Sequence, residues 1–286
     1  MGERDAKASL AGLRVLSLES RRAPEMAKLI ASYGGQAIVA PSMREVPLET
    51  NTEALAFATK LLRGEFDMVI FLTGVGTRAL ARVVETIYPL SEYVARLRDI
   101  AVIARGPKPL AVLREWNVPV AVVAPEPNTW REVLRALDEN AAAVPLKGKR
   151  VAVQEYGVSN SDLLDGLAKR GARVTSVPVY EWALPEDTGP LRSAIAAIAR
   201  NEIDVMLFTT ATQVDHLLKI AAEIKQEQAL RTALSRIFLA SIGPTTSERM
   251  REHGIEPDME PSHPKMGFLV SESAERAAEA LRGKRA

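Results

Sequence analysis

A stretch rich in hydroxyl groups, residues 236–251, carries the clearest local pattern for chemistry. An apolar run over 237–242 is followed by Gly243 and Pro244, and then by two threonines and a serine at 245–247. This order predicts a buried strand, a tight turn and a helix whose first amides lack internal partners, which is the local arrangement of an anion site. The glycine would let a ligand approach the backbone, and the threonine hydroxyls could cap the helix or donate to a carboxylate. An ordinary capped helix after a buried strand would explain the same residues.

The pattern occurs twice, because the two halves of the chain repeat each other. Three stretches of the first half align with the second at an offset of 136 or 137: residues 12–16 with 148–152, 66–80 with 203–217, and 99–118 with 236–255. Gly106 falls on Gly243 in this alignment. Self-similarity of this length indicates a tandem duplication.

Composition excludes several classes of function. A net charge of +1 argues against nucleic-acid binding, which normally needs a clear basic excess. The absence of cysteine excludes disulfides and thiolate chemistry, and the three histidines, at 216, 253 and 263, lack the spacing of a metal site. The sequence does not open on a signal-peptide core, and no apolar run reaches the ~20 residues that cross a membrane. We therefore expect a cytoplasmic protein that binds no metal, nucleic acid or membrane.

Apolar strands alternate with helical segments along both halves, which predicts an α/β fold with parallel sheets. The predicted strands include residues 67–73 and 118–123. A turn at 74–77 is expected to lead into a helix over 78–87, and residues 1–11 are expected to form a frayed tail.

The boundary between the copies need not be the boundary between domains. Two proline-flanked segments without helix or strand periodicity, 42–49 and 179–187, lie at equivalent places in the two copies. If the chain crosses at both, one domain comprises 1–43 plus 185–286 and the other comprises 50–179. The crossing linkers would then be 44–49 and 180–184, lying side by side.

Four short motifs occur in the order typical of one enzyme family. They are VIFLT with its Gly/Thr-rich turn (69–77), SVPVY (176–180), LFTTAT (207–212) and SIGPTT (241–246). In this order they resemble the motifs of uroporphyrinogen-III synthases over essentially the full chain. The last motif is the most specific, because the family commonly has Ile-Gly-x-x-Thr at that place.

The resemblance implies a fold and an activity. The fold would be two flavodoxin-like or Rossmann-like parallel-sheet domains, interleaved by the duplication and joined by a two-stranded linker, with a cleft between them. The activity would be that of a cofactor-free lyase of tetrapyrrole and haem biosynthesis. Its substrate would be hydroxymethylbilane, a linear tetrapyrrole with eight carboxylates, which is closed to uroporphyrinogen III with inversion of the last pyrrole ring. We expect a monomer.

Candidate site residues follow partly from the resemblance and partly from the strand-to-helix turns. Tyr180 matches the tyrosine that family members place at the cleft, and it is the candidate general acid for loss of the terminal hydroxyl. The others would bind substrate: Thr73, Gly74, Gly76, Thr77, Arg105, Gly106, Lys108, Glu155, Tyr156, Thr210, Ala211, Thr212, Gly243, Pro244, Thr245 and Thr246. Helix amides and hydroxyl groups at several turns would hold an octa-anion without a large basic patch.

Some interpretations stay open. Gly74 stands where many family members have serine, and Arg105 with Lys108 makes the first-half turn more basic than expected, so which domain contributes more to anion binding is undecided. Tyr180 could equally be a packing residue at a domain junction. Gly74 and Gly76 form too short a glycine motif to support a dinucleotide site.

Two other functions fit the same pattern. One is a non-catalytic small-molecule-binding regulator that uses the same interdomain cleft. The other is an enzyme that acts on sugar phosphates at the helix starts. Turnover of hydroxymethylbilane separates these alternatives, because only a synthase would form product.

Overall fold

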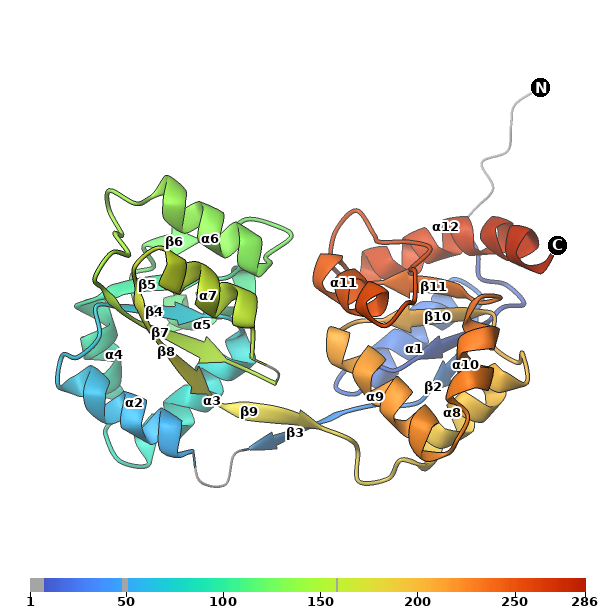
Figure 1. The fold of residues 1–286 in the computed structure, drawn as a ribbon, viewed down its shortest axis with the longest axis horizontal. Helices are drawn as coiled ribbons and strands as arrows, with labels where there is room; N and C mark the ends of the chain where they lie inside the picture. Colours follow the sequence, from blue (N-terminus) through green and yellow to red (C-terminus); the bar gives the residue numbers. More distant parts are fainter. Residues whose placement is uncertain (1–7, 48–50, 158) are drawn as a thin grey trace. The chain divides into compact units, whose positions relative to one another are not determined.

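The chain forms two compact units, each built around one parallel sheet (Figure 1). The structure, a computed structural model, describes residues 8–47, 51–157 and 159–286. Unit 1 comprises Met1–Arg44 and Ala183–Ala286, and unit 2 comprises Glu45–Trp182.

The chain passes between the units twice, and the two crossing strands pair with each other. β3 (Arg44–Pro47) and β9 (Tyr180–Ala183) form a two-stranded sheet. The linkers predicted at 44–49 and 180–184 overlap these strands, although residues 48 and 49 lie outside the described part of the chain. The predicted fold class, an α/β chain with two parallel sheets and a two-stranded linker, is confirmed.

Unit 1 has a four-stranded parallel sheet in the order β11-β10-β1-β2. Its strands are β1 (Arg14–Ser17), β2 (Gln36–Val39), β10 (Val205–Phe208) and β11 (Phe238–Ser241). One face packs against α1 (Ala23–Ser32) and α12 (Met266–Arg285). The other face packs against α8 (Gly189–Ala199), α9 (Ala211–Glu223), α10 (Glu227–Leu234) and α11 (Pro244–Glu252).

Unit 2 has a five-stranded parallel sheet in the order β6-β5-β4-β7-β8. Its strands are β4 (Met68–Phe71), β5 (Ala101–Ala104), β6 (Val122–Val123), β7 (Arg150–Glu155) and β8 (Arg173–Pro178). One face carries α2 (Thr52–Leu62), α3 (Gly74–Glu85), α4 (Leu90–Arg98) and α5 (Pro107–Glu115). The other carries α6 (Trp130–Glu139) and α7 (Ser161–Lys169).

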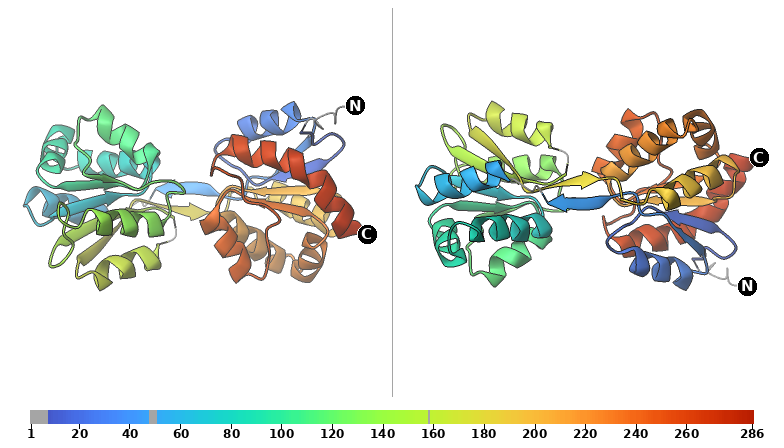
Figure 2. Two further views of the ribbon diagram at one scale, coloured as in Figure 1. Left: turned by 90° about the horizontal axis from the view of Figure 1, so that it is seen from above. Right: turned by 90° about the horizontal axis from the view of Figure 1, so that it is seen from below.

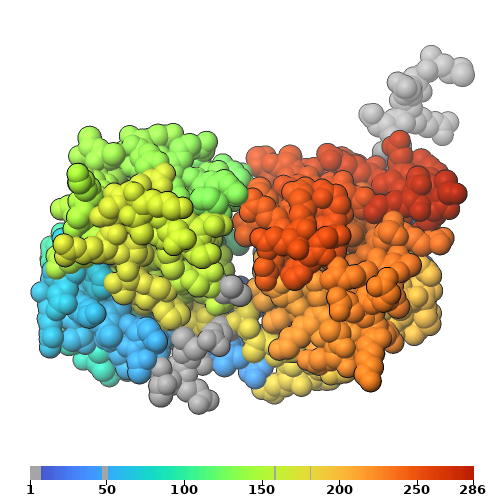
Figure 3. Space-filling model, viewed as in Figure 1, coloured from blue at the N-terminus to red at the C-terminus, as the bar shows by residue number. Residues whose placement is uncertain are grey.

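Helices on both faces explain why the strands read as continuous apolar runs (Figure 2). In β10, Val205 and Leu207 pack toward α1 and α12, whereas Met206 and Phe208 pack toward α8 and α9. All four side chains are fully buried. Side chains close the visible face of each unit (Figure 3), and buried apolar side chains form one cluster on each face of each sheet.

Three local predictions need correction. The predicted turn at 74–77 is the first turn of α3, because the Thr73 side chain caps the helix there. The strand predicted over 118–123 is shorter than expected, because only β6 forms there, paired with β5. The tail predicted over 1–11 ends sooner than expected, because Leu10 is fully buried and its N–H donates to the carbonyl of Tyr33 at 2.7 Å.

The duplication preserves one ion pair at the amino ends of the strands. Arg150 donates to Asp67 from its main-chain N–H and from its guanidinium, at 2.8 to 3.0 Å, and Arg14 does the same to Asp204 at 2.8 to 3.1 Å. These bonds lower the pKa of Asp67 to about 2, chiefly through the guanidinium. The Arg14–Asp204 pair joins β1 to β10, and the Arg150–Asp67 pair joins β7 to β4. Each pair thus helps to set the register of its two strands.

Candidate functional site

Because every strand pair within the two main sheets is parallel, the carboxyl ends of the strands share one edge in each unit, where open α/β sheets bind ligands. In unit 2 this edge carries Thr73 after β4, Arg105 after β5 and Tyr156 after β7. In unit 1 the corresponding edge carries Thr210 after β10 and Gly243 after β11. The sequence-predicted residues therefore gather at two edges, one in each unit.

At the end of β4 the predicted residues mainly build the start of α3. The Thr73 hydroxyl accepts the N–H of Gly76 at 2.9 Å, and the fully buried Thr77 donates its hydroxyl to the Thr73 carbonyl at 2.7 Å. A Cβ on Gly74 would lie 2.7 Å from the carbonyl oxygen of Lys108, and a Cβ on Gly76 would overlap the Gln154 amide. Both glycines are thus explained by close packing of this helix start.

The end of β5 presents two cations. The Arg105 guanidinium donates to the Tyr156 hydroxyl at 2.7 Å and lies 5.1 Å from the centre of the Tyr156 ring. Lys108 is exposed in the first turn of α5. Gly106 precedes this helix, and a Cβ there would lie 2.6 Å from the Asn128 side chain. Arginine and lysine in this position suit a carboxylate ligand.

Glu155, at the end of β7, is buried and fully engaged by neighbours. Its carboxylate accepts the Ser159 hydroxyl at 2.8 and 3.0 Å, the Asn160 N–H at 2.8 Å and a short bond from the Ser176 hydroxyl. A carboxylate held by these donors shapes the loop that follows β7. We therefore interpret Glu155 as a residue that supports the edge.

Tyr180 lies at the same end of unit 2, in an aromatic cluster. Its ring centre is 6.2 Å from that of Tyr156 and 5.5 Å from that of Trp182, and the residue is 4% exposed. Its carbonyl accepts the N–H of Gly157 at 2.9 Å. The structure thus places Tyr180 beside Tyr156, which follows β7, in a packed position.

In unit 1 the end of β10 is built from hydroxyl and amide groups. Thr210 caps α9 by accepting the N–H of Thr212, so that Ala211 begins the helix. The preceding Thr209 donates to Glu19 at 2.6 Å and receives a bond from Gln213 at 2.9 Å. Thr209 and Gln213 were not among the predicted site residues. Their closeness in sequence to Thr210, at the same strand-to-helix turn, could have identified them.

The turn after β11 is held by serines. Gly243 precedes α11 without a side-chain cap, so of the two possibilities for the threonines, capping the helix is not the one that the structure shows. The buried Ser241 and Ser247 bond to each other at 2.8 Å, and Ser241 also bonds both backbone polar groups of Gly243, at 3.0 and 3.2 Å. Thr245 is consequently left exposed, whereas Thr246 is buried beside Ser247.

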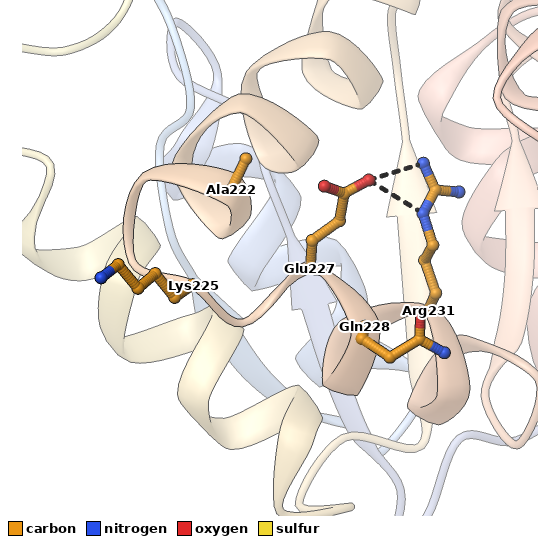
Figure 4. A pocket seen from close by; sticks show the side chains of 5 residues that line it. All are labelled: Ala222, Lys225, Glu227, Gln228 and Arg231. Carbon is orange, nitrogen blue, oxygen red and sulfur yellow. Dashed lines mark hydrogen bonds and ion pairs between the residues drawn. The ribbon is translucent and has the colours of Figure 1, made fainter.

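A separate surface depression of about 400 Å³ lies between α9 and α10. It is lined by Ala222, Lys225, Glu227, Gln228 and Arg231, with Glu227 and Arg231 paired to each other (Figure 4). It is at the end of α9 remote from Thr210, and so does not belong to the strand edge. Its lining is a solvated ion pair rather than a set of converging ligand groups.

Over residues 8–47, 51–157 and 159–286, no three histidine or acidic side chains are grouped so that they could hold a metal ion. Within the same described ranges, no helix combines the length and the apolarity needed to cross a membrane.

The fold and the two edges define a class: an α/β protein of two interleaved units, with anion-compatible helix starts at the carboxyl edge of each sheet. The family model described as uroporphyrinogen-III synthase HemD matches residues 24–271. The chain belongs to the uroporphyrinogen-III synthase family, as its motifs suggested.

Relatives agree with this assignment. The chain is 32% identical to a putative uroporphyrinogen-III synthase of Methanothermobacter thermautotrophicus, over 82% of this chain and 87% of the relative. It is 28% identical to the uncharacterized protein YjjA of Bacillus subtilis, over 93% and 96% of the two chains.

Solved structures are also similar. A mutant uroporphyrinogen III synthase from Thermus thermophilus superposes with a TM-score of 0.70 at 25% identity, covering 94% of this chain and all of the other. The uroporphyrinogen-III synthetase of Helicobacter pylori has a TM-score of 0.51 at 19% identity over 94% of this chain, which supports the fold alone.

Proposed function

We propose that this chain is a uroporphyrinogen-III synthase that converts hydroxymethylbilane to uroporphyrinogen III and water. The observation that carries the proposal is the family match over residues 24–271, supported by similarity to the Thermus thermophilus enzyme over 94% of the chain. The reaction is a lyase reaction of tetrapyrrole biosynthesis. Nothing in the structure favours the regulator or the sugar-phosphate enzyme over this function.

The chemistry needs mainly positioning. Loss of the terminal hydroxyl as water leaves an azafulvene, which the substituted carbon of the last pyrrole ring attacks to form a spiro intermediate. Fragmentation and reclosure then invert that ring, and the pyrroles supply the electrons. The protein must hold the chain in the conformation that favours this path over direct closure, and positional catalysis of this kind is a large effect.

We propose that the exposed and partly buried groups at the strand edges contact the substrate, and that the buried ones support them. Arg105, Lys108 and Thr245 are accessible enough to bind carboxylates directly. Thr77, Glu155 and the glycines of α3 act through the shape of the edge, because their polar groups or contacts are taken up locally. The accessible groups match a polyanionic ligand in charge and hydrogen-bonding character.

Tyr180 is proposed as the acid that assists departure of the terminal hydroxyl. A phenol is a suitable weak acid for this step, and the Tyr180 ring lies against Tyr156, the hydrogen-bond partner of Arg105. Because Tyr180 is 4% exposed, this role requires the ring of Tyr156 or Trp182 to move when substrate binds. A residue that served only as packing would need no such movement.

The proposed function is tested with the purified full-length chain and freshly prepared hydroxymethylbilane. Products are oxidised to porphyrins and the isomers are separated by chromatography. We expect the type III isomer in excess, at a rate above that of spontaneous closure. Formation of the type I isomer alone, at the spontaneous rate, would refute the proposal.

A monomeric state and a cytoplasmic location are part of the same proposal. Light scattering during size-exclusion chromatography tests the first, with a mass near 31.1 kDa expected for one chain. Fractionation of producing cells tests the second.

A further inference from the structure

Arg105 is a partly buried cation whose guanidinium contacts a neutral partner, Tyr156. Its guanidinium donates to the Tyr156 hydroxyl at 2.7 Å and stacks over the same ring, 5.1 Å from its centre. Among the described residues, no carboxylate forms an ion pair with Arg105. A guanidinium has five N–H donors, so most of them remain available to an anionic ligand.

The sheet order explains how this contact arises. β5 and β7 flank β4, so the Arg105 side chain extends past the end of β4 to reach Tyr156. The contact therefore spans the carboxyl end of β4, the strand that Thr73 and α3 follow. A guanidinium fixed in this position faces the edge at which open parallel sheets bind ligands.

The carboxylate nearest in sequence to Tyr156 is kept from neutralising Arg105. Glu155 is buried and receives hydrogen bonds from Ser159, Ser176 and the Asn160 N–H. These bonds occupy the carboxylate and hold the first part of the loop. The Glu155 carboxylate bonds with Ser176 on β8, whereas the Tyr156 hydroxyl bonds with Arg105 after β5, so the two side chains have different surroundings.

Tyr156 is itself held in place. The next residue, Gly157, donates its N–H to the Tyr180 carbonyl at 2.9 Å, and the rings of Tyr156 and Tyr180 are 6.2 Å apart. Gly157 has a φ of +62°, which favours glycine, and a Cβ there would overlap the Trp182 ring. The phenol is thus anchored through its backbone and its ring before it meets Arg105.

We infer that Tyr156 is a positioning residue that holds Arg105 ready to bind a carboxylate of the substrate. This inference rests on the proposed function and refines it. Fixing a long side chain before binding reduces the entropy lost on association, and a planar guanidinium can then bind a carboxylate with two parallel hydrogen bonds. Tyr156 acts through Arg105, not on the reacting atoms, so its loss should affect KM more than kcat.

The test is a double-mutant cycle on the full-length chain with hydroxymethylbilane. Tyr156→Phe should raise KM ~3–10-fold, because the ring remains while the bond that fixes the guanidinium is lost. Arg105→Gln should raise KM at least ~10-fold. For both, kcat should stay within about twofold of wild type. In the double variant, KM should match that of Arg105→Gln within about twofold, because Tyr156 then has nothing to position.

Two controls separate positioning from folding. Tyr88→Phe removes a phenol from unit 2 at the opposite end of α3 from Thr73, and it should leave KM unchanged. Arg105→Lys leaves Tyr156 intact and keeps the charge, but it cannot form the planar two-bond contact. It should raise KM ~3–10-fold, and it serves as the test if Tyr156→Phe does not fold.

Each outcome has a distinct meaning. An unchanged KM in Tyr156→Phe, or additive effects of the two substitutions in the double variant, would overturn the positioning role while leaving the synthase activity of the wild-type chain in place. If wild type forms no type III isomer, the proposed function fails and the inference fails with it.

Discussion

The two strand edges derive from one ancestral sequence but now differ in chemistry. In unit 2 the edge carries Arg105, Lys108 and an aromatic cluster around Tyr156. In unit 1 the turn after β11 is held by Ser241 and Ser247, and the end of β10 is built from threonine and glutamine. The duplicated backbone has therefore been kept while the side chains at its ligand-binding edges have diverged.

One equivalent position shows how the divergence works. Glu19 and Glu155 correspond at the offset of 136. Glu155 is the last residue of β7, and Glu19 lies two residues past the end of β1. Glu155 is buried and bound by Ser159 and Ser176, whereas Glu19 accepts the Thr209 hydroxyl at 2.6 Å and is partly exposed. The same acidic residue supports a packed aromatic loop in unit 2 and a hydroxyl-lined end of β10 in unit 1. We propose that unit 2, through Arg105 and Lys108, supplies charge to the substrate and that unit 1 supplies neutral hydrogen-bond donors.

The prediction with the largest expected effect concerns the packing of the loop after β7 in unit 2. Gly157→Ala places a Cβ on Trp182 at a φ of +62°, so it should combine steric overlap with backbone strain. We expect a loss of about 2–5 kcal/mol in the free energy of unfolding, measured by urea denaturation. Unit 1 has Arg21 at the equivalent position, so this constraint belongs to unit 2 alone.

Gly148→Ala is the matched control. Its φ is +76°, but a Cβ there meets no atom within 4 Å. Gly148→Ala should therefore lower the free energy of unfolding only through backbone strain, by about 1 kcal/mol. Equal losses for the two variants would show that the Trp182 ring moves aside easily, and that the aromatic cluster is not rigid.

The second prediction concerns the arginine–aspartate ion pair at the amino ends of the strands. Both units have this pair, and in unit 1 a second arginine, Arg285, also binds the aspartate. Burial raises the pKa of Asp204, but hydrogen bonds from Arg14 and Arg285 outweigh it and hold that pKa well below its usual range. Asp67 has Arg150 as its guanidinium partner, with a pKa of about 2. Asp204→Asn should cost about 2 kcal/mol of stability at pH 7, and Asp67→Asn about 1 kcal/mol because it is more exposed.

The pH dependence gives the sign of this effect. A depressed carboxylate pKa stabilises the fold above the unfolded value of ~3.9, and this stabilisation is lost as the pH falls through the folded value. The stability gap between wild type and Asp67→Asn should therefore be full at pH 7 and should close between pH ~4 and ~2. A gap that stayed constant down to pH ~2 would mean that the ion pair contributes nothing through its charge.

Much of the fold was predictable from sequence, because it depends on local patterns. Apolar runs marked the strands, and the repeat marked equivalent elements in the two units. The start of α3 was misjudged because the helix is fixed by a hydrogen bond from the Gly76 N–H to the Thr73 hydroxyl, which hydrophobic periodicity does not reveal. Leu10 was assigned to a tail because its burial depends on a contact with Tyr33 and on the core of unit 1.

The candidate site was predictable in position more than in detail. Residues at strand-to-helix turns were identified because every turn of a parallel sheet lies at the same edge. The contact between Arg105 and Tyr156 joins residues 51 apart in sequence, and it follows from the strand order β5-β4-β7, which the repeat alone does not specify. The role of Ser241 and Ser247 depends on a three-dimensional turn in which two hydroxyls meet.

The third prediction asks whether the aromatic cluster takes part in chemistry. Tyr180 corresponds to Arg44 in the other copy, so any acid at this place is specific to the second crossing strand. General acid assistance typically contributes ~10²–10⁴-fold, and the azafulvene forms readily unaided, so Tyr180→Phe should lower kcat at least ~10-fold. KM should change little, because the ring and its packing remain. The measurement is the steady-state rate corrected for spontaneous closure.

Tyr88→Phe again serves as the control for phenol removal in unit 2, and it should leave kcat unchanged. A Tyr180→Phe rate within twofold of wild type would leave Tyr180 as a packing residue. Positioning at the two edges would then account for catalysis.

The prediction with the smallest expected effect compares one position of unit 2 with the equivalent position of unit 1. Lys108 and Thr245 correspond at the offset of 137, and both are exposed in the first turn of their helices, α5 and α11. If unit 2 supplies charge and unit 1 neutral donors, Lys108→Gln should raise KM ~2–3-fold at low salt. This difference should disappear near 1 M salt, where the screening length is ~3 Å. Thr245→Val should raise KM less than about twofold, because an exposed hydroxyl is readily replaced by water, and its effect should not depend on salt.

Lys60→Gln supplies the control for net charge, because Lys60 is exposed in the last turn of α2, away from the strand edge. It should change KM by less than about 1.5-fold at any salt concentration, since a single surface charge at a distance is screened. If Lys60→Gln and Lys108→Gln shift KM equally, overall charge explains the effect and the local cation does not. If Thr245→Val has the larger and salt-independent effect, the neutral edge of unit 1 binds the substrate more strongly, and the division of roles between the units is reversed.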